Sequence, residues 1–64
     1  MRYQFIFKNS DETLTIEVKR DTDQEAIEAA RQELKYGIFQ QVIIRQQLTA
    51  DSCGPVKYLT TVTL

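Results

Sequence analysis

A single stretch with the apolar spacing of a helix, residues 23–36, lies between two pairs of segments that have the pattern of β-strands. Residues 2–8 and 13–19 alternate before it, and residues 40–48 and 56–64 carry the strand pattern after it. One helix can cover one face of one sheet. The predicted fold is therefore α+β, a two-layer domain in which a four-stranded, mainly antiparallel sheet (β-β-α-β-β) packs on one helix.

The length of the chain limits it to one domain, spanning residues 1–64. A chain this short buries only about 60% of its unfolded surface, so a partner or a second copy would add to a marginal core. The apolar runs, such as Val42–Ile44, are far too short for a membrane helix. The lone Cys53 cannot form an internal disulfide, which favours a cytoplasmic protein.

Alternation assigns each strand residue to one of two faces, and the apolar face should meet the helix. In the first pair of strands this face holds Tyr3, Phe5, Phe7, Leu14, Ile16 and Val18. In the second pair it holds Val42, Ile44, Leu48, Val56, Tyr58, Thr60, Val62 and Leu64. Both hairpins should be antiparallel, whereas the strand order across the helix connection is left open.

The helix has clear start and stop signals. Thr22 and Glu25 have the spacing of a capping box, and Gly37 is predicted to end the helix in the left-handed conformation. Ile27, Ala30 and Leu34 form the inward stripe, with small alanines beside it that allow close approach to a sheet.

Few residues could support catalysis or hold a cofactor. The chain has no histidine, and Cys53, without a neighbouring base, reads as a bystander in the loop. The acids from Asp21 to Glu25 lack the glycine and spacing of a calcium loop, and the two glycines are too far apart to cradle phosphate. We therefore predict that the protein is not an enzyme and has no catalytic residues, cofactor or metal.

The charges are unevenly distributed along the chain. Residues 11–33 hold eight of the nine acids and only three of the eight basic residues. The sheet face away from the helix should in contrast be basic and rich in glutamine. Its predicted members are Arg2, Gln4, Ile6, Lys8, Thr15, Glu17, Lys19, Gln41, Ile43, Arg45, Gln47, Lys57, Leu59 and Thr61.

This face has the anatomy of a protein interface, an apolar centre with a polar rim. The predicted interface residues are Ile6, Gln41, Ile43, Arg45, Gln47, Lys57 and Leu59. The predicted partner is another protein, with a homodimer as one form of that contact.

Other interpretations stay open. In a nucleic-acid interpretation, basic residues follow the phosphate backbone: Arg2, Lys8, Lys19, Arg45 and Lys57. The stacking aromatics of the first strand, however, point toward the helix. An open sheet face is also ordinarily polar without any partner. Finally, the acidic helix face could mimic nucleic acid, although Arg31 and Lys35 fit ordinary pairing within the helix better.

Residues 14–34, with the acidic cap and the run Glu25-Ala26-Ile27-Glu28-Ala29-Ala30, resemble the strand-to-helix unit of small proteins of phages and mobile elements. DpnD/PcfM-like and some anti-CRISPR proteins have similar segments. The resemblance carries over no functional residue. It implies an accessory protein that acts by binding, such as an inhibitor or adaptor of a host complex.

Overall fold

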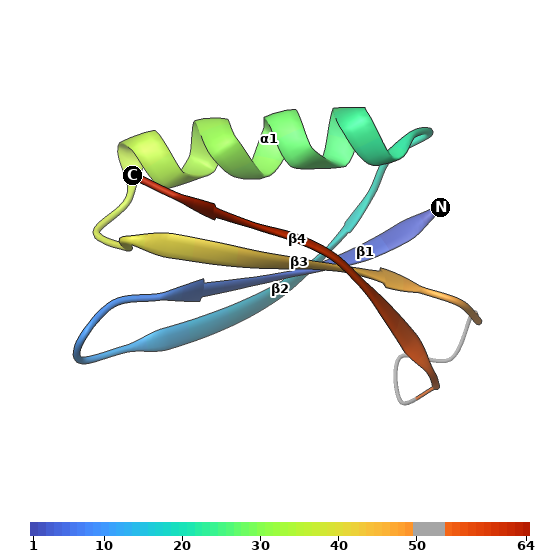
Figure 1. Ribbon diagram of the computed structural model, residues 1–64, viewed down its shortest axis with the longest axis horizontal. Helices are drawn as coiled ribbons and strands as arrows, with labels where there is room; N and C mark the ends of the chain where they lie inside the picture. The colour runs from blue at the N-terminus through green and yellow to red at the C-terminus, as the bar shows by residue number, and fades with distance from the viewer. Residues whose placement is uncertain (50–53) are drawn as a thin grey trace.

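The computed structural model describes residues 1–49 and 54–64 and has the predicted α+β fold (Figure 1). Its elements are β1 (Arg2–Lys8), β2 (Thr13–Lys19), α1 (Asp23–Tyr36), β3 (Gln41–Gln47) and β4 (Val56–Thr63). The strands form one antiparallel sheet in the order β2-β1-β3-β4, with α1 along one face. After the helix, β3 returns to pair with β1, so these two strands are central. Cys53, for which the sequence predicts no role, lies outside the described residues.

Asn9 organises the turn between β1 and β2. Its side-chain oxygen accepts hydrogen bonds from the backbone N–H groups of Asp11, at 2.8 Å, and Glu12, at 2.6 Å. The backbone N–H of Asn9 donates to the carbonyl of Glu12 at 3.0 Å. The asparagine side chain thus satisfies two turn donors that no strand reaches.

Helix α1 begins at its predicted cap. The Thr22 hydroxyl accepts a hydrogen bond from the backbone N–H of Glu25 at 3.2 Å. The Glu25 carboxylate accepts from the N–H of Asp21 at 3.3 Å, not from that of Thr22. The threonine half of the capping box is therefore confirmed, whereas the glutamate reaches one residue further back.

The predicted left-handed conformation of Gly37 is wrong. Gly37 has φ −101° and ψ −179°, an extended conformation that any residue can adopt. The chain turns out of the helix because Phe39 packs against the core, with its ring centroid 5.7 Å from that of Phe7. The helix thus ends where Phe39 packs against the core, without a left-handed glycine.

The core lies between α1 and the two central strands. Its buried members are Tyr3, Phe5, Phe7, Ala26, Ala30, Leu34, Val42 and Ile44. The small alanines let the helix approach the sheet closely, and α1 packs against β1, β3 and β4. Strand β2 lies at the sheet edge, and its Leu14, although predicted to face the core, is 48% exposed.

A β-bulge changes the facing of residues within β4. Ile44 pairs with Thr60 and Arg45 pairs with Tyr58, so Leu59 is an extra residue with no partner on β3. Tyr58 therefore shares the face of Arg45, and Leu59 packs against the core. The predicted inward facing of Tyr58, and of Val56 two residues before it, is wrong.

Candidate functional site on the open face of the sheet

The sheet face opposite α1 is covered by no other element of the described chain (Figure 1). Ile6 and Ile43 lie directly opposite each other on the two central strands, and both side chains are partly exposed. Thr15 pairs with Ile6 on one side and Thr61 pairs with Ile43 on the other. The structure thus brings together two of the three predicted apolar residues, between two threonines.

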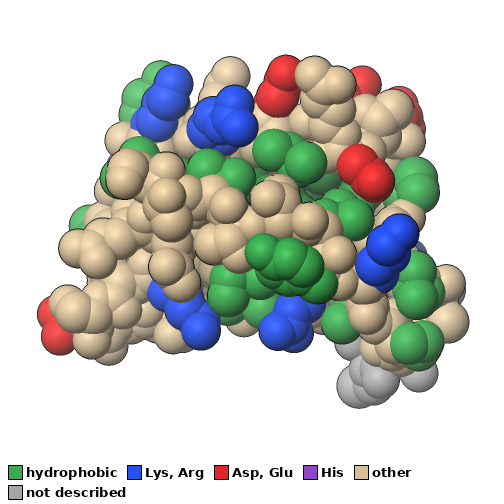
Figure 2. Space-filling model, viewed as in Figure 1, with side chains coloured by type: hydrophobic (Ala, Val, Ile, Leu, Met, Phe, Trp, Pro, Cys, Tyr) green, Lys and Arg blue, Asp and Glu red, His purple; other side chains and the backbone are tan. Residues whose placement is uncertain are grey.

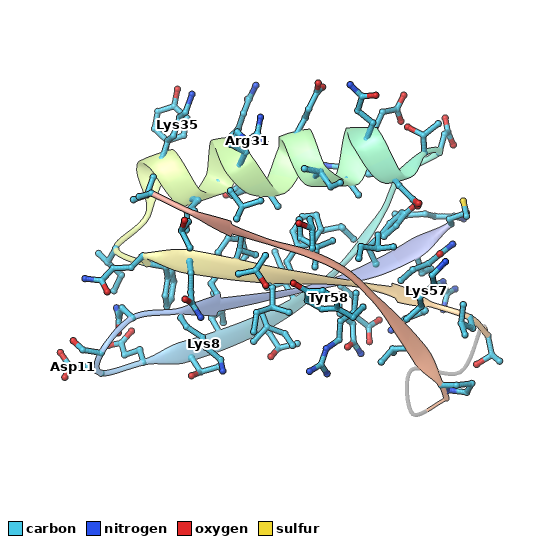
Figure 3. The ribbon with its side chains drawn as sticks, in the orientation of Figure 1. Lys8, Asp11, Arg31, Lys35, Lys57 and Tyr58 are labelled. Atoms are coloured by element: carbon cyan, nitrogen blue, oxygen red, sulfur yellow. The ribbon has the colours of Figure 1, made fainter. Side chains whose placement is uncertain are left out.

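Arg45 and Tyr58 form the next row of this face. Arg45 pairs with Gln4 on β1 and with Tyr58 on β4. Tyr58 (Figure 3) is 59% exposed. Its hydroxyl lies 2.9 Å from Oγ1 of Thr61. That hydrogen bond holds the ring beside the guanidinium-bearing strand, where it can stack on a ligand or on the arginine.

Two predicted interface residues do not lie on the open face. Leu59, the bulged residue, is partly buried and packs against the core cluster. Lys57 pairs with Gln46, which itself pairs with the buried Tyr3, so the register places Lys57 on the helix side of the sheet. The physical reason is the same for both: one extra residue in a strand reverses the facing of everything on one side of it.

Tyr58 is not among the predicted residues of the open face, although the sequence holds a signal for its position. Leu59 and Val62 are both apolar but stand three residues apart, so a regular strand cannot turn both toward one core. In the structure both pack against the core cluster. An odd spacing of apolar residues inside a strand pattern therefore indicated the bulge.

The two glutamines of the predicted interface have different environments. Gln41 pairs with Lys8 on β1 and is partly exposed. Gln47 pairs with Val56 and is only 7% exposed, and neither its amide nitrogen nor its amide oxygen has a hydrogen-bond partner among residues 1–49 and 54–64. Because it is buried, Gln47 offers a contacting molecule little surface. Its unpartnered amide also destabilises the fold.

The open face is basic. By register it carries Arg2, Lys8, Lys19 and Arg45, against one acid, Glu17. Arg31 and Lys35 instead project from the outer side of α1 (Figure 3). Figure 2 shows acidic side chains toward the N-terminal end of α1 and basic ones along the lower edge of the sheet. This separation of charge gives the open face a positive electrostatic potential.

The best-defined hollows in the described part of the surface are open and shallow. Across residues 1–49 and 54–64, no group of three histidine, cysteine or acidic residues could hold a metal ion. A shallow hollow of about 240 Å³ near the hairpin is lined by Lys8, Asn9, Ser10, Gln40 and Gln41. No helix among the described residues is long and apolar enough to cross a membrane.

Comparisons with known proteins add no relative. No family model matches the chain, and neither a curated protein nor a solved structure matches it. The resemblance of residues 14–34 to small phage and mobile-element proteins therefore stays a prediction. The function has to be argued from the open face itself.

Proposed function

We propose that the protein is a non-enzymatic binding protein that contacts an acidic partner protein through the open face of its sheet. The main support is that two cross-strand pairs, Arg45–Tyr58 and Ile6–Ile43, lie next to each other on an uncovered face of the sheet. Arginine and tyrosine are enriched where interfaces gain most of their binding energy, and the isoleucines supply an apolar centre. If the resemblance of residues 14–34 to small phage and mobile-element proteins reflects a shared role, the protein would act as a cytoplasmic adaptor or inhibitor of a host complex.

The test is an affinity capture from native host lysate with four baits: the wild-type chain, Ile43→Asp, Arg45→Glu and Arg31→Glu. The last is the matched control, because it makes the same charge change on the outer side of α1. The wild-type chain and the control should both capture one protein in stoichiometric amount, and nuclease treatment should not reduce that capture. It should be lost with Ile43→Asp and Arg45→Glu, each of which should weaken binding by at least about 2 kcal/mol.

Circular dichroism of each bait shows whether it folds. If folded Ile43→Asp retains the partner as well as the wild-type chain does, the open face is not the binding site. Retention by folded Arg45→Glu would likewise count against the open face, and a loss with Arg31→Glu would place the contact on α1 instead.

Nucleic acid is the second candidate, and one structural observation favours it. The bulge brings the exposed ring of Tyr58 next to Arg45, so the open face has an aromatic side chain for base stacking among its basic residues. In that case, binding to an oligothymidine should weaken steeply with salt. Arg45→Ala should weaken it and flatten the salt dependence, whereas Lys57→Ala, on the other side of the sheet, should not. Salt-independent binding, or equal effects of the two variants, would count against this function.

A further inference from the structure

The two edges of the sheet are built differently. Strand β4 is preceded by Pro55, carries a bulge at Leu59 and has Lys57 near its start, all of which hinder pairing with another strand. Strand β2 has seven residues with neither proline nor glycine, and it pairs with β1 without a register shift. The β2 edge therefore lacks the features that usually block strand addition, apart from its charged residues.

The hydrogen bonds of the hairpin show which backbone groups of β2 face this edge. Met1 and Arg20 exchange two bonds, from the terminal amine at 2.9 Å and from the Arg20 N–H at 3.0 Å. Hydrogen-bonded and non-hydrogen-bonded pairs alternate along an antiparallel ladder. The even-numbered residues of β2 therefore bond to β1. The N–H and C=O groups that point outward belong to Thr13, Thr15, Glu17 and Lys19.

The helix side of the same edge is apolar and poorly covered. Leu14 is 48% exposed, while Ile16 and Val18 are partly exposed. Beside them lies a hollow of about 120 Å³ lined by Phe7, Leu14, Ile16, Glu33, Gly37 and Phe39. The edge thus offers outward backbone groups beside an apolar row, the two features that strand addition uses. One of these groups, the Lys19 carbonyl, accepts a 2.7 Å hydrogen bond from the exposed Arg20 guanidinium, which a second strand would displace.

We infer that β2 pairs antiparallel with β2 of a second copy of this chain, with the two-fold axis at Ile16. Only this register pairs every apolar residue of the row with another: Ile16 with itself, and Leu14 with Val18 of the second copy. These become non-hydrogen-bonded pairs, in which side chains approach most closely. The four outward-facing residues then form pairs that exchange about eight hydrogen bonds.

Charge complementarity supports the same register. Thr15 lies opposite Glu17 of the second copy and Thr13 lies opposite Lys19, so no like charges are directly opposed within the strand. Just beyond the strand, Glu12 lies opposite Arg20 of the second copy. The two-fold symmetry repeats this opposite-charge pair at the other end of the interface. Moving the register by one step to Glu17 would place two glutamates directly opposite each other. In the resulting continuous sheet, the open faces of the two copies would lie on the same side. Ile43 and Arg45 would not take part in the contact between the copies.

Light scattering over a concentration series tests the dimer. The wild-type chain and Ile43→Asp should both dimerise, which separates this inference from the proposed function. Thr15→Pro removes an outward N–H that β1 does not use, so it should raise the dimer dissociation constant at least about tenfold. Leu14→Glu should do the same without a proline. A wild-type chain that stays monomeric at millimolar concentration, or folded Thr15→Pro and Leu14→Glu that both stay dimeric, would overturn the inference.

Cysteine cross-linking tests the register, in a Cys53→Ser background. At the two-fold axis the Cα atoms of Ile16→Cys would lie about 4.5 Å apart, within disulfide range. Those of Val18→Cys would lie about 13 Å apart, which is too far. Oxidation should therefore link Ile16→Cys and leave Val18→Cys unlinked. Linking of the Val18 variant alone would refute this register.

Discussion

The hydroxyl of Tyr3 donates a 2.6 Å hydrogen bond to Oδ1 of Asp23, joining the first strand to the first turn of α1. Tyr3 is fully buried, so its polar end needs a partner, and the first helical residue supplies one. The same carboxylate lies at the positive end of the helix dipole. A single contact thus couples strand, helix cap and core.

Removing this hydroxyl should destabilise the fold. We expect Tyr3→Phe to lower the free energy of unfolding by about 1–2 kcal/mol, because a hydrogen bond to a charged acceptor is lost while the ring stays packed. Urea denaturation measures the change. Tyr36→Phe is the matched control, since Tyr36 is 89% exposed, and it should leave stability unchanged. Equal effects of the two variants would contradict the structural role of the contact.

Alkaline pH should lower the free energy of unfolding, because Tyr3 ionises less readily in the folded protein than in the unfolded chain. Burial and the neighbouring Asp23 raise the pKa of Tyr3 from 10.0 to about 12. The unfolded state therefore loses this proton first, so the stabilisation is complete below pH 10 and is lost as pH rises toward 12. Denaturation between pH 9 and 12 should show a smaller loss for Tyr3→Phe, and parallel curves would contradict this.

The bulge predicts which of two adjacent residues supports the core. Leu59→Ala should lower the free energy of unfolding by about 2 kcal/mol, because Leu59 packs against the core cluster. Tyr58→Ala should cost less than about 1 kcal/mol, because its ring is mostly exposed. The regular alternation of the strand predicts the opposite order. Thermal and urea unfolding of both variants decide between the two facings.

Gly37 should tolerate a side chain. Its backbone is extended, and an added Cβ would lie 3.4 Å from the carbonyl oxygen of Glu33, an ordinary contact. Gly37→Ala should therefore be neutral or stabilise the fold by up to about 1 kcal/mol, because it restricts the unfolded chain. A loss of more than about 1 kcal/mol would instead indicate a left-handed glycine.

Gln47 should be replaceable by an apolar residue. Its amide is buried and has no hydrogen-bond partner in the described part of the chain, which costs about 1–3 kcal/mol. We expect Gln47→Leu to raise the free energy of unfolding by about 1 kcal/mol, measured by urea denaturation. Gln41→Leu, at a partly exposed position of the same strand, serves as the comparison and should change stability less. Destabilisation by Gln47→Leu would show that the amide has a partner.

Much of the candidate site could be predicted from local patterns. Alternation along the first strand correctly places Tyr3, Phe5 and Phe7 in the core and Ile6 on the open face. Alternation along β3 likewise places Ile43 and Arg45 on the open face. It failed on β4, where Leu59 and Lys57 were assigned to the open face and Tyr58 to the core. A bulge forms against a neighbouring strand, so a pattern within one strand does not specify it.

The sequence by itself determined the elements and their order, because strand alternation, helical spacing and the Thr22 cap act between residues close in the chain. Only the tertiary structure decided the strand order, the facing of Tyr58 and the exposure of Leu14, because these depend on contacts between distant segments. It also decided the conformation of Gly37, beside which Phe39 packs into the core. Local preference selects the elements, and their mutual packing selects which side chains remain available for binding.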